Sequence, residues 1–132
     1  MKRIILFLAS IAILLQGCAV TPDLRQIGPY PANYKSIIKD YAEKAFFDPY
    51  TMRSVSLSSP VEGHLFFQQG WITCLRANAK NRMGGYTGLK STAILINNGR
   101  VLQTMSEAPL CNDPRMQYEP WPEMDAGTST PK

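Results

Sequence analysis

The sequence predicts an α+β domain in which one N-terminal amphipathic helix packs on a small antiparallel sheet of three to five strands. Two observations carry this prediction. Apolar residues recur at intervals of three and four between Tyr34 and Phe46, which is the period of a helix with one buried face. After Pro49 the period changes to two, as it does in half-buried strands.

The helix has recognisable limits in the sequence. Asn33 is a residue type that caps helices, because its side-chain oxygen can accept a bond from a free backbone N–H. Asp48-Pro49 marks the end, because a residue before proline avoids the helical region.

Five segments are expected as strands. Alternation is clearest in residues 71–79, where Trp71, Thr73 and Leu75 would share one face. Asn98-Gly99 between two apolar segments is a strong hairpin signal, and residues 60–63 read as a turn. The expected strands lie around Val55 and Leu57 and over residues 65–68, 71–79, 91–96 and 100–105.

The chain divides into four parts along its length. Residues 1–17 form a signal segment, 18–32 a Pro-containing tether, 33–124 the folded domain and 125–132 a tail that we expect to be disordered. The segment from Ala108 onward is rich in proline and has no period, although Trp121 suggests that part of it docks on the domain.

The N-terminus indicates export and lipid anchoring. Lys2 and Arg3 precede an apolar run that ends at Leu15, and Gly17-Cys18 follows. This layout resembles the lipobox of bacterial lipoproteins, which implies that the Cys18 thiol receives a diacylglycerol. Because Ala19 is not the Asp that commonly retains lipoproteins in the inner membrane, the resemblance implies the periplasmic face of the outer membrane.

Two other interpretations of this segment stay open. A cleaved secretory signal without lipid would have similar basic and apolar parts, although its cleavage site is usually Ala-x-Ala-like. A retained anchor is disfavoured, because a membrane-spanning helix needs about 20 apolar residues and this run is shorter.

The remaining cysteines, Cys74 and Cys111, form an even pair in a compartment that is expected to be oxidising. They predict one disulfide, and two buried free thiols are the alternative.

Charge is distributed unevenly. No Asp or Glu occurs between Glu62 and Glu107, whereas this stretch contains five basic residues and His64. The basic residues could form a surface for anionic partners, or they could be scattered over alternating strand faces. We favour scattered charges, because spacing alone does not show that the charges converge. The chain's net charge of +4 includes two charges in the signal segment, so nucleic acid is not an expected partner.

The densest polar segment is residues 78–88. Its glycines permit a tight strand-to-strand turn, and Asn and Thr can bond loop backbone groups. The segment is therefore either a turn stabilised by its own side chains or a loop that presents polar groups to a partner. Its candidate binding residues are Asn78, Lys80, Asn81, Tyr86 and Thr87.

Three short motifs together carry a family resemblance. The chain resembles small, uncharacterised bacterial envelope lipoproteins in three segments: Asp48-Pro49-Tyr50, the stretch 78–81 (NAKN) and the stretch 84–88 (GGYTG). The resemblance covers roughly residues 33–105, and it implies a location and a fold but no reaction.

Groups for catalysis are few. His64 is the only imidazole, and zinc needs three or four suitable ligands, so we expect no metal, no cofactor and no enzymatic activity. We expect a lipid-anchored periplasmic protein that binds an envelope protein or a cell-wall glycan. The alternatives are an inhibitor of a muramidase-type cell-wall hydrolase and a minor hydrolase or thiol enzyme that uses His64, with Cys74 as a possible thiolate.

Overall fold

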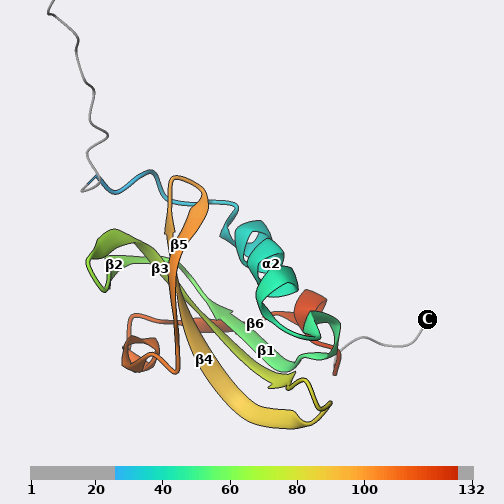
Figure 1. Cartoon of the computed structure of the whole chain (residues 1–132). Helices are drawn as coiled ribbons and strands as arrows, with labels where there is room; N and C mark the ends of the chain where they lie inside the picture. The colour runs from blue at the N-terminus through green and yellow to red at the C-terminus, as the bar shows by residue number, and fades with distance from the viewer. Residues whose placement is uncertain (1–25, 128–132) are drawn as a thin grey trace, which may run out of the picture.

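The computed structural model describes residues 26–127 (Figure 1). The signal segment, Cys18 and residues 128–132 lie outside the described residues. Within this range there is one α-helix, and six antiparallel strands form a single sheet. The strand order is β5-β4-β3-β1-β6, and β2 is also paired with β3. The strands are β1 (Arg53–Ser58), β2 (Val61–Leu65), β3 (Gln68–Lys80), β4 (Tyr86–Asn97), β5 (Arg100–Ser106) and β6 (Tyr118–Pro120).

The fold class predicted from the sequence is wrong. The sheet has six strands rather than three to five, so the fold is mostly β, with a helix on part of one face. The helix, α2 (Tyr34–Ala45), is also not N-terminal, because a described segment from Gln26 precedes it.

Two strands, β2 and β6, were not predicted from the sequence, and pairing with distant residues explains both. Residues 60–63 were expected to form a turn, but 61–63 belong to β2, where Gly63 pairs with Gly70 of β3 and the side chain of Ile72 lies over the space that a Gly63 Cβ would need. The strand expected over 65–68 is likewise wrong, because Phe66 and Phe67 form the turn between β2 and β3. β6 is only three residues long and gains its extended form from pairing with β1. Neither segment has a local pattern that identifies a strand.

The amphipathic stripe of α2 is confirmed. Ile38 and Ala42 are fully buried, and Tyr34, Ile37 and Tyr41 pack partly buried against the same core. Asn33 occupies the position before the helix, but its side chain makes no capping hydrogen bond. The last residue is Ala45, and Pro49 begins a short 3-10 turn, η1 (Pro49–Thr51).

The sheet is covered on both faces. On one face α2 and the 3-10 turn η3 (Pro122–Met124) cover the first core, which includes Leu75, Ile94 and Trp121. On the other face, η2 (Pro109–Asn112) covers a second core that contains Ile72 and Leu95 (Figure 1). The alternation predicted for residues 71–79 is therefore confirmed, and each half of it faces a separate core.

The described C-terminal segment continues beyond the expected domain boundary at residue 124. The Asp125 carboxylate accepts a bond from the Val55 N–H at 3.0 Å, and the Ala126 N–H donates to the Met52 carbonyl at 2.8 Å. Contacts with the sheet therefore extend into the segment that was expected to be a disordered tail.

The segment before α2 is bound to one end of the sheet. The Asn97 side chain accepts a bond from the Gly28 N–H at 2.8 Å and donates to the carbonyls of Gln26 and Gln69 at 3.2 Å. Trp71 Nε1 donates to the Gly28 carbonyl at 2.9 Å. Part of the predicted tether is thus fixed to β3 and β4.

We predict that Asn97→Ala frees this segment. The change removes three hydrogen bonds of a buried amide and leaves backbone groups without partners, so the unfolding free energy should fall by about 1–3 kcal/mol. Amide exchange at Gly28 should accelerate. Gln68→Ala, at an exposed neighbouring side chain, is the control. Unchanged exchange at Gly28 would contradict the role assigned to Asn97.

Candidate functional site

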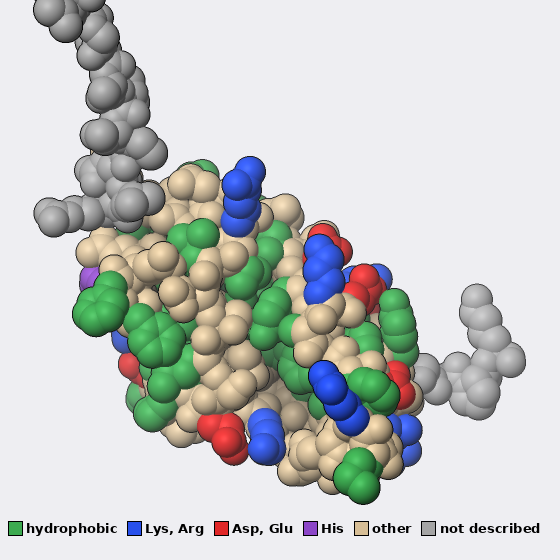
Figure 2. Space-filling view, viewed as in Figure 1, with side chains coloured by type: hydrophobic (Ala, Val, Ile, Leu, Met, Phe, Trp, Pro, Cys, Tyr) green, Lys and Arg blue, Asp and Glu red, His purple; other side chains and the backbone are tan. Residues whose placement is uncertain are grey.

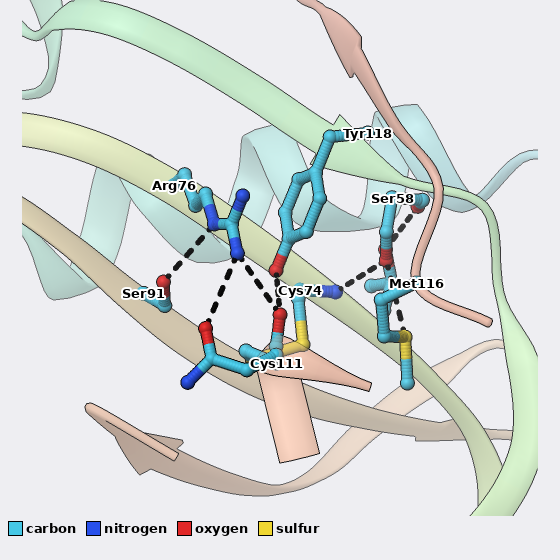
Figure 3. The surroundings of a disulfide bond; sticks show 9 residues. Ser58, Cys74, Arg76, Ser91, Cys111, Met116 and Tyr118 are labelled. Atoms are coloured by element: carbon cyan, nitrogen blue, oxygen red, sulfur yellow. Dashed lines mark hydrogen bonds between the residues drawn. A yellow bond between two sulfur atoms is a disulfide. The ribbon is translucent and has the colours of Figure 1, made fainter. Parts of the chain in front are cut away.

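Cys74 and Cys111 form a disulfide, as predicted (Figure 3). Their Cα atoms are 5.7 Å apart, and both residues are buried in the second core. The bond attaches η2 to the middle of β3 across 37 residues of chain. Because the Cys74 sulfur is bonded, the thiolate pair with His64 that the sequence allowed has no nucleophile in this protein.

Arg76 is engaged beside the disulfide rather than free on a basic surface (Figure 3). Its guanidinium donates to the Cys111 carbonyl at 3.1 Å and to Ser91 Oγ at 3.3 Å, and it stacks 3.7 Å from the Tyr118 ring centroid. The Tyr118 hydroxyl donates to the same Cys111 carbonyl at 2.9 Å. Burial raises the pKa of Tyr118, and the charge of Arg76 opposes that rise.

Most of the candidate binding loop is a hairpin between β3 and β4. Only residues 81–85 form the turn, and Asn81 organises it. Its side-chain oxygen accepts bonds from the N–H groups of Met83 at 3.0 Å and Gly85 at 3.1 Å, and its own N–H donates to the Gly85 carbonyl. Gly84 has a φ of +83°, which few other residues adopt without strain.

Asn78 and Thr87 also bind within the hairpin. The Asn78 side chain accepts a bond from the Gly88 N–H at 3.0 Å, and Thr87 Oγ1 donates to the Ala79 carbonyl at 3.2 Å. Three of the five candidate residues therefore stabilise the hairpin through its own backbone. This arrangement fixes the shape of the hairpin.

Tyr86 and two cationic side chains form a cluster at the base of this hairpin. The Tyr86 hydroxyl donates to the Thr51 carbonyl at 2.9 Å. The Arg53 guanidinium lies 4.5 Å and the Lys80 ammonium 5.3 Å from the centre of its ring. Such contacts between a cation and an aromatic ring hold a positive charge in place.

Further charged and apolar groups lie on the same hairpin. Arg82 and Lys90 are exposed, although the Lys90 ammonium lies 3.9 Å from the Glu107 carboxylate, and the side chains of Met83 and Leu89 are 94% and 61% exposed. Lys and Arg side chains are visible at the end of the molecule where the β3–β4 hairpin lies (Figure 2). We call this group the basic hairpin: Arg53, Lys80, Arg82, Met83, Tyr86, Leu89 and Lys90.

His64 lies on β2, at a shallow pocket of about 580 Å³ that Glu62, Gln69 and Arg115 also line. Arg115 is already paired with Asp113 at 2.9 Å, and this pairing holds the pKa of the Asp113 carboxyl at about 2. Among the described residues, no group of three His, Cys, Asp or Glu side chains could hold a metal ion.

A second hollow, of about 310 Å³, lies between α2 and β5. The apolar residues Ile37, Tyr41 and Val101 line it, together with charged residues that include Lys44 and Arg100. None of the five candidate binding residues lines it.

Comparisons with known proteins identify no relative. No family model matches the chain, and no curated protein or solved structure matches it either. The resemblance to uncharacterised envelope lipoproteins therefore stays a prediction. In the part of the chain that the structure describes, no helix is long and apolar enough to cross a membrane.

Sequence reasoning missed Arg53 and the binding of the tether. Arg53 lies outside the acid-free stretch, and only the pairing of β1 with β3, which places Arg53 opposite Asn78, brings it to the hairpin. The tether is bound through Asn97, whose partners Gln26 and Gln69 are distant in the chain, so no local pattern predicts this contact.

We predict that Asn81→Ala destabilises the hairpin whereas Arg82→Ala does not. Removing the Asn81 oxygen replaces two hydrogen bonds of the exposed turn by bonds to water, at a cost of about 1–2 kcal/mol in unfolding free energy. Arg82 is exposed in the same turn, so its removal should change stability by less than about 0.5 kcal/mol. Denaturant unfolding measures both. Equal losses would show that turn composition, not the Asn81 bonds, sets the stability.

Proposed function

We propose that this chain is a non-enzymatic, lipid-anchored protein on the periplasmic face of the outer membrane that binds an anionic envelope component through the basic hairpin. The partner is a cell-wall glycan or an envelope protein. The observation that carries this proposal is the course of β3. It runs from Gln68, next to the bound tether, to Lys80, at the base of the basic hairpin.

The disulfide supports export. A bond between Cys74 and Cys111 persists in oxidising compartments and is rare in the cytosol. It also uses both cysteines of the folded domain, which leaves Cys18 as the cysteine available for acylation. Three acyl chains would hold a protein stably, whereas one chain gives marginal binding.

The chemistry of the hairpin supports recognition of an anion. Arg53 and Lys80 are held near the Tyr86 ring, and the Asn81 bonds fix the turn. A surface that is organised before binding loses less conformational entropy when the partner arrives. The nearby exposed side chains of Met83 and Leu89 add apolar area, so the partner should combine negative charge with an apolar surface, as sugar rings with carboxylates do.

One observation favours the second candidate, an inhibitor of a muramidase-type hydrolase. Turn residues 81–85 are all exposed and include Arg82. Glycoside hydrolases place paired carboxylates in a cleft, and a basic turn is complementary in charge to such a cleft. The two candidates use the same surface, so they differ in partner and not in site.

We predict that Cys18→Ser removes the anchor. Without the thiol no diacylglycerol can be attached, so the protein should leave the membrane fraction or keep its signal segment. The mass of the N-terminal peptide and membrane partition measure this. A Cys18→Ser protein with the same processed mass and the same membrane partition as the wild type would contradict lipidation.

We predict that reversing two charges of the basic hairpin abolishes binding. Arg82→Glu with Lys90→Glu should weaken sedimentation with purified cell-wall sacculi by roughly tenfold or more and lower its salt dependence. Lys35→Glu with Lys39→Glu, on exposed positions of α2, makes the same change in net charge and serves as the control.

Three outcomes separate the candidates. Loss of sedimentation in the hairpin variant alone supports glycan binding. If neither the wild type nor the hairpin variant sediments, but the wild type inhibits a muramidase and the hairpin variant does not, the protein is better described as a muramidase inhibitor. Equal behaviour of the two variants in both assays contradicts a role for the basic hairpin.

A further inference from the structure

The turn between β2 and β3 consists of two phenylalanines. Leu65 pairs with Gln68, so Phe66 and Phe67 alone form the connection. The Phe66 side chain is 60% exposed, and that of Phe67 is 101% exposed. Phe67 buries none of its side chain in the domain and Phe66 buries less than half, so packing does not explain two adjacent aromatic residues at a hairpin tip.

The turn's backbone does not favour these residues either. Phe66 has a φ of +54°, a conformation that suits Asn or Gly and is unfavourable for bulky side chains. The β4–β5 turn of the same sheet meets the same demand with Asn98 at +49° and Gly99 at +74°. A residue choice that opposes local preference without a gain in packing points to a function outside the domain.

The two phenylalanines lie beside the point where the tether joins the domain. The Asn97 amide donates to the carbonyls of both Gln26 and Gln69, and Gln69 is two residues from Phe67. Ile27 lines the same pocket as His64 and Gln69. In Figure 1 the first described residues and the β2–β3 turn lie on the same side of the molecule.

The length of chain before Gln26 limits how far this end can lie from an anchor. Eight peptide units join Cys18 to Gln26, and in any conformation they span at most about 28 Å. If Cys18 is acylated, the β2–β3 turn is therefore held close to the bilayer surface. Such tethering gives the turn an effective concentration at the membrane in the millimolar range, so a weak contact is sufficient.

We propose that Phe66 and Phe67 insert into the interfacial region of the lipid bilayer and orient the anchored domain. This inference rests on the lipid anchoring proposed above. Aromatic side chains favour the level of the lipid headgroups. The tip also suits an interface chemically, because no charged side chain occurs from Leu65 through Leu75, so insertion would not strip a charge of its water.

The contact would have a consequence for the basic hairpin. β3 has its first residue at the Phe66–Phe67 turn and its last at Lys80, and a strand of its 13 residues is about 40 Å long. With the β2–β3 turn at the bilayer, the basic hairpin is directed away from the membrane of its own anchor. The bilayer contact thus supplies orientation, while the acyl chains supply attachment.

The test compares Phe67→Trp with Met83→Trp. Both positions are exposed tips of hairpins at opposite ends of β3, and each variant adds one tryptophan to the same two others. The acylated full-length proteins are reconstituted into phosphatidylethanolamine–phosphatidylglycerol vesicles with or without brominated acyl chains. We expect brominated lipid to quench the fluorescence of the tryptophan added at position 67 and the emission of that tryptophan to be shifted to the blue. The Met83→Trp protein should show no more quenching than the wild type.

The mass of the N-terminal peptide, measured on the same samples, separates the possible failures. Absence of the lipid contradicts the proposed anchoring and this inference with it. An acylated, vesicle-bound Phe67→Trp protein without quenching contradicts only the inference. So does equal quenching at 67 and 83, which would show that the domain has no fixed orientation. Photocrosslinking of position 67 to an envelope protein, without quenching, would assign the turn to a protein partner instead.

Discussion

The structure depends on the pairing of β3, whose 13 residues cross the whole sheet. One edge of β3 pairs with β4, from Trp71–Ile96 to Lys80–Tyr86, and the other edge is shared by β2 and β1. Its alternating side chains enter two separate cores. Because a one-residue slip would exchange these two sets of side chains, burial on both faces fixes the register of the entire sheet.

The two faces of that strand are covered by different means. The amphipathic helix supplies an apolar stripe for one face. The other face is covered by an irregular segment that includes η2, and such a segment has few backbone bonds of its own to keep it in place. The Cys74–Cys111 bond and the contacts of Arg76 with Cys111 and Tyr118 supply that attachment. In the chain-entropy view, a crosslink over such a loop stabilises a domain by a few kcal/mol.

The two ends of β3 differ in chemistry, and this difference underlies the proposed function. At one end the tether is bound by Asn97 and Trp71, and the adjoining turn is aromatic and uncharged. At the other end, cations surround Tyr86 in a hairpin fixed by Asn81. Because these two ends lie at opposite ends of one strand of 13 residues, β3 would keep the proposed membrane contact and the proposed partner contact apart.

The sequence by itself determined the elements whose residues are periodic or locally bonded. These are the stripe of α2, the alternation along residues 71–79 and the Asn98-Gly99 turn; the single pair of domain cysteines likewise predicted the disulfide. Only the tertiary structure decided that β2 and β6 are strands, because their extended form comes from pairing with distant residues. It also decided which charges converge. Arg76 is drawn to the disulfide and Arg53 to Tyr86, since contacts across a sheet depend on strand order and register, which no local pattern encodes.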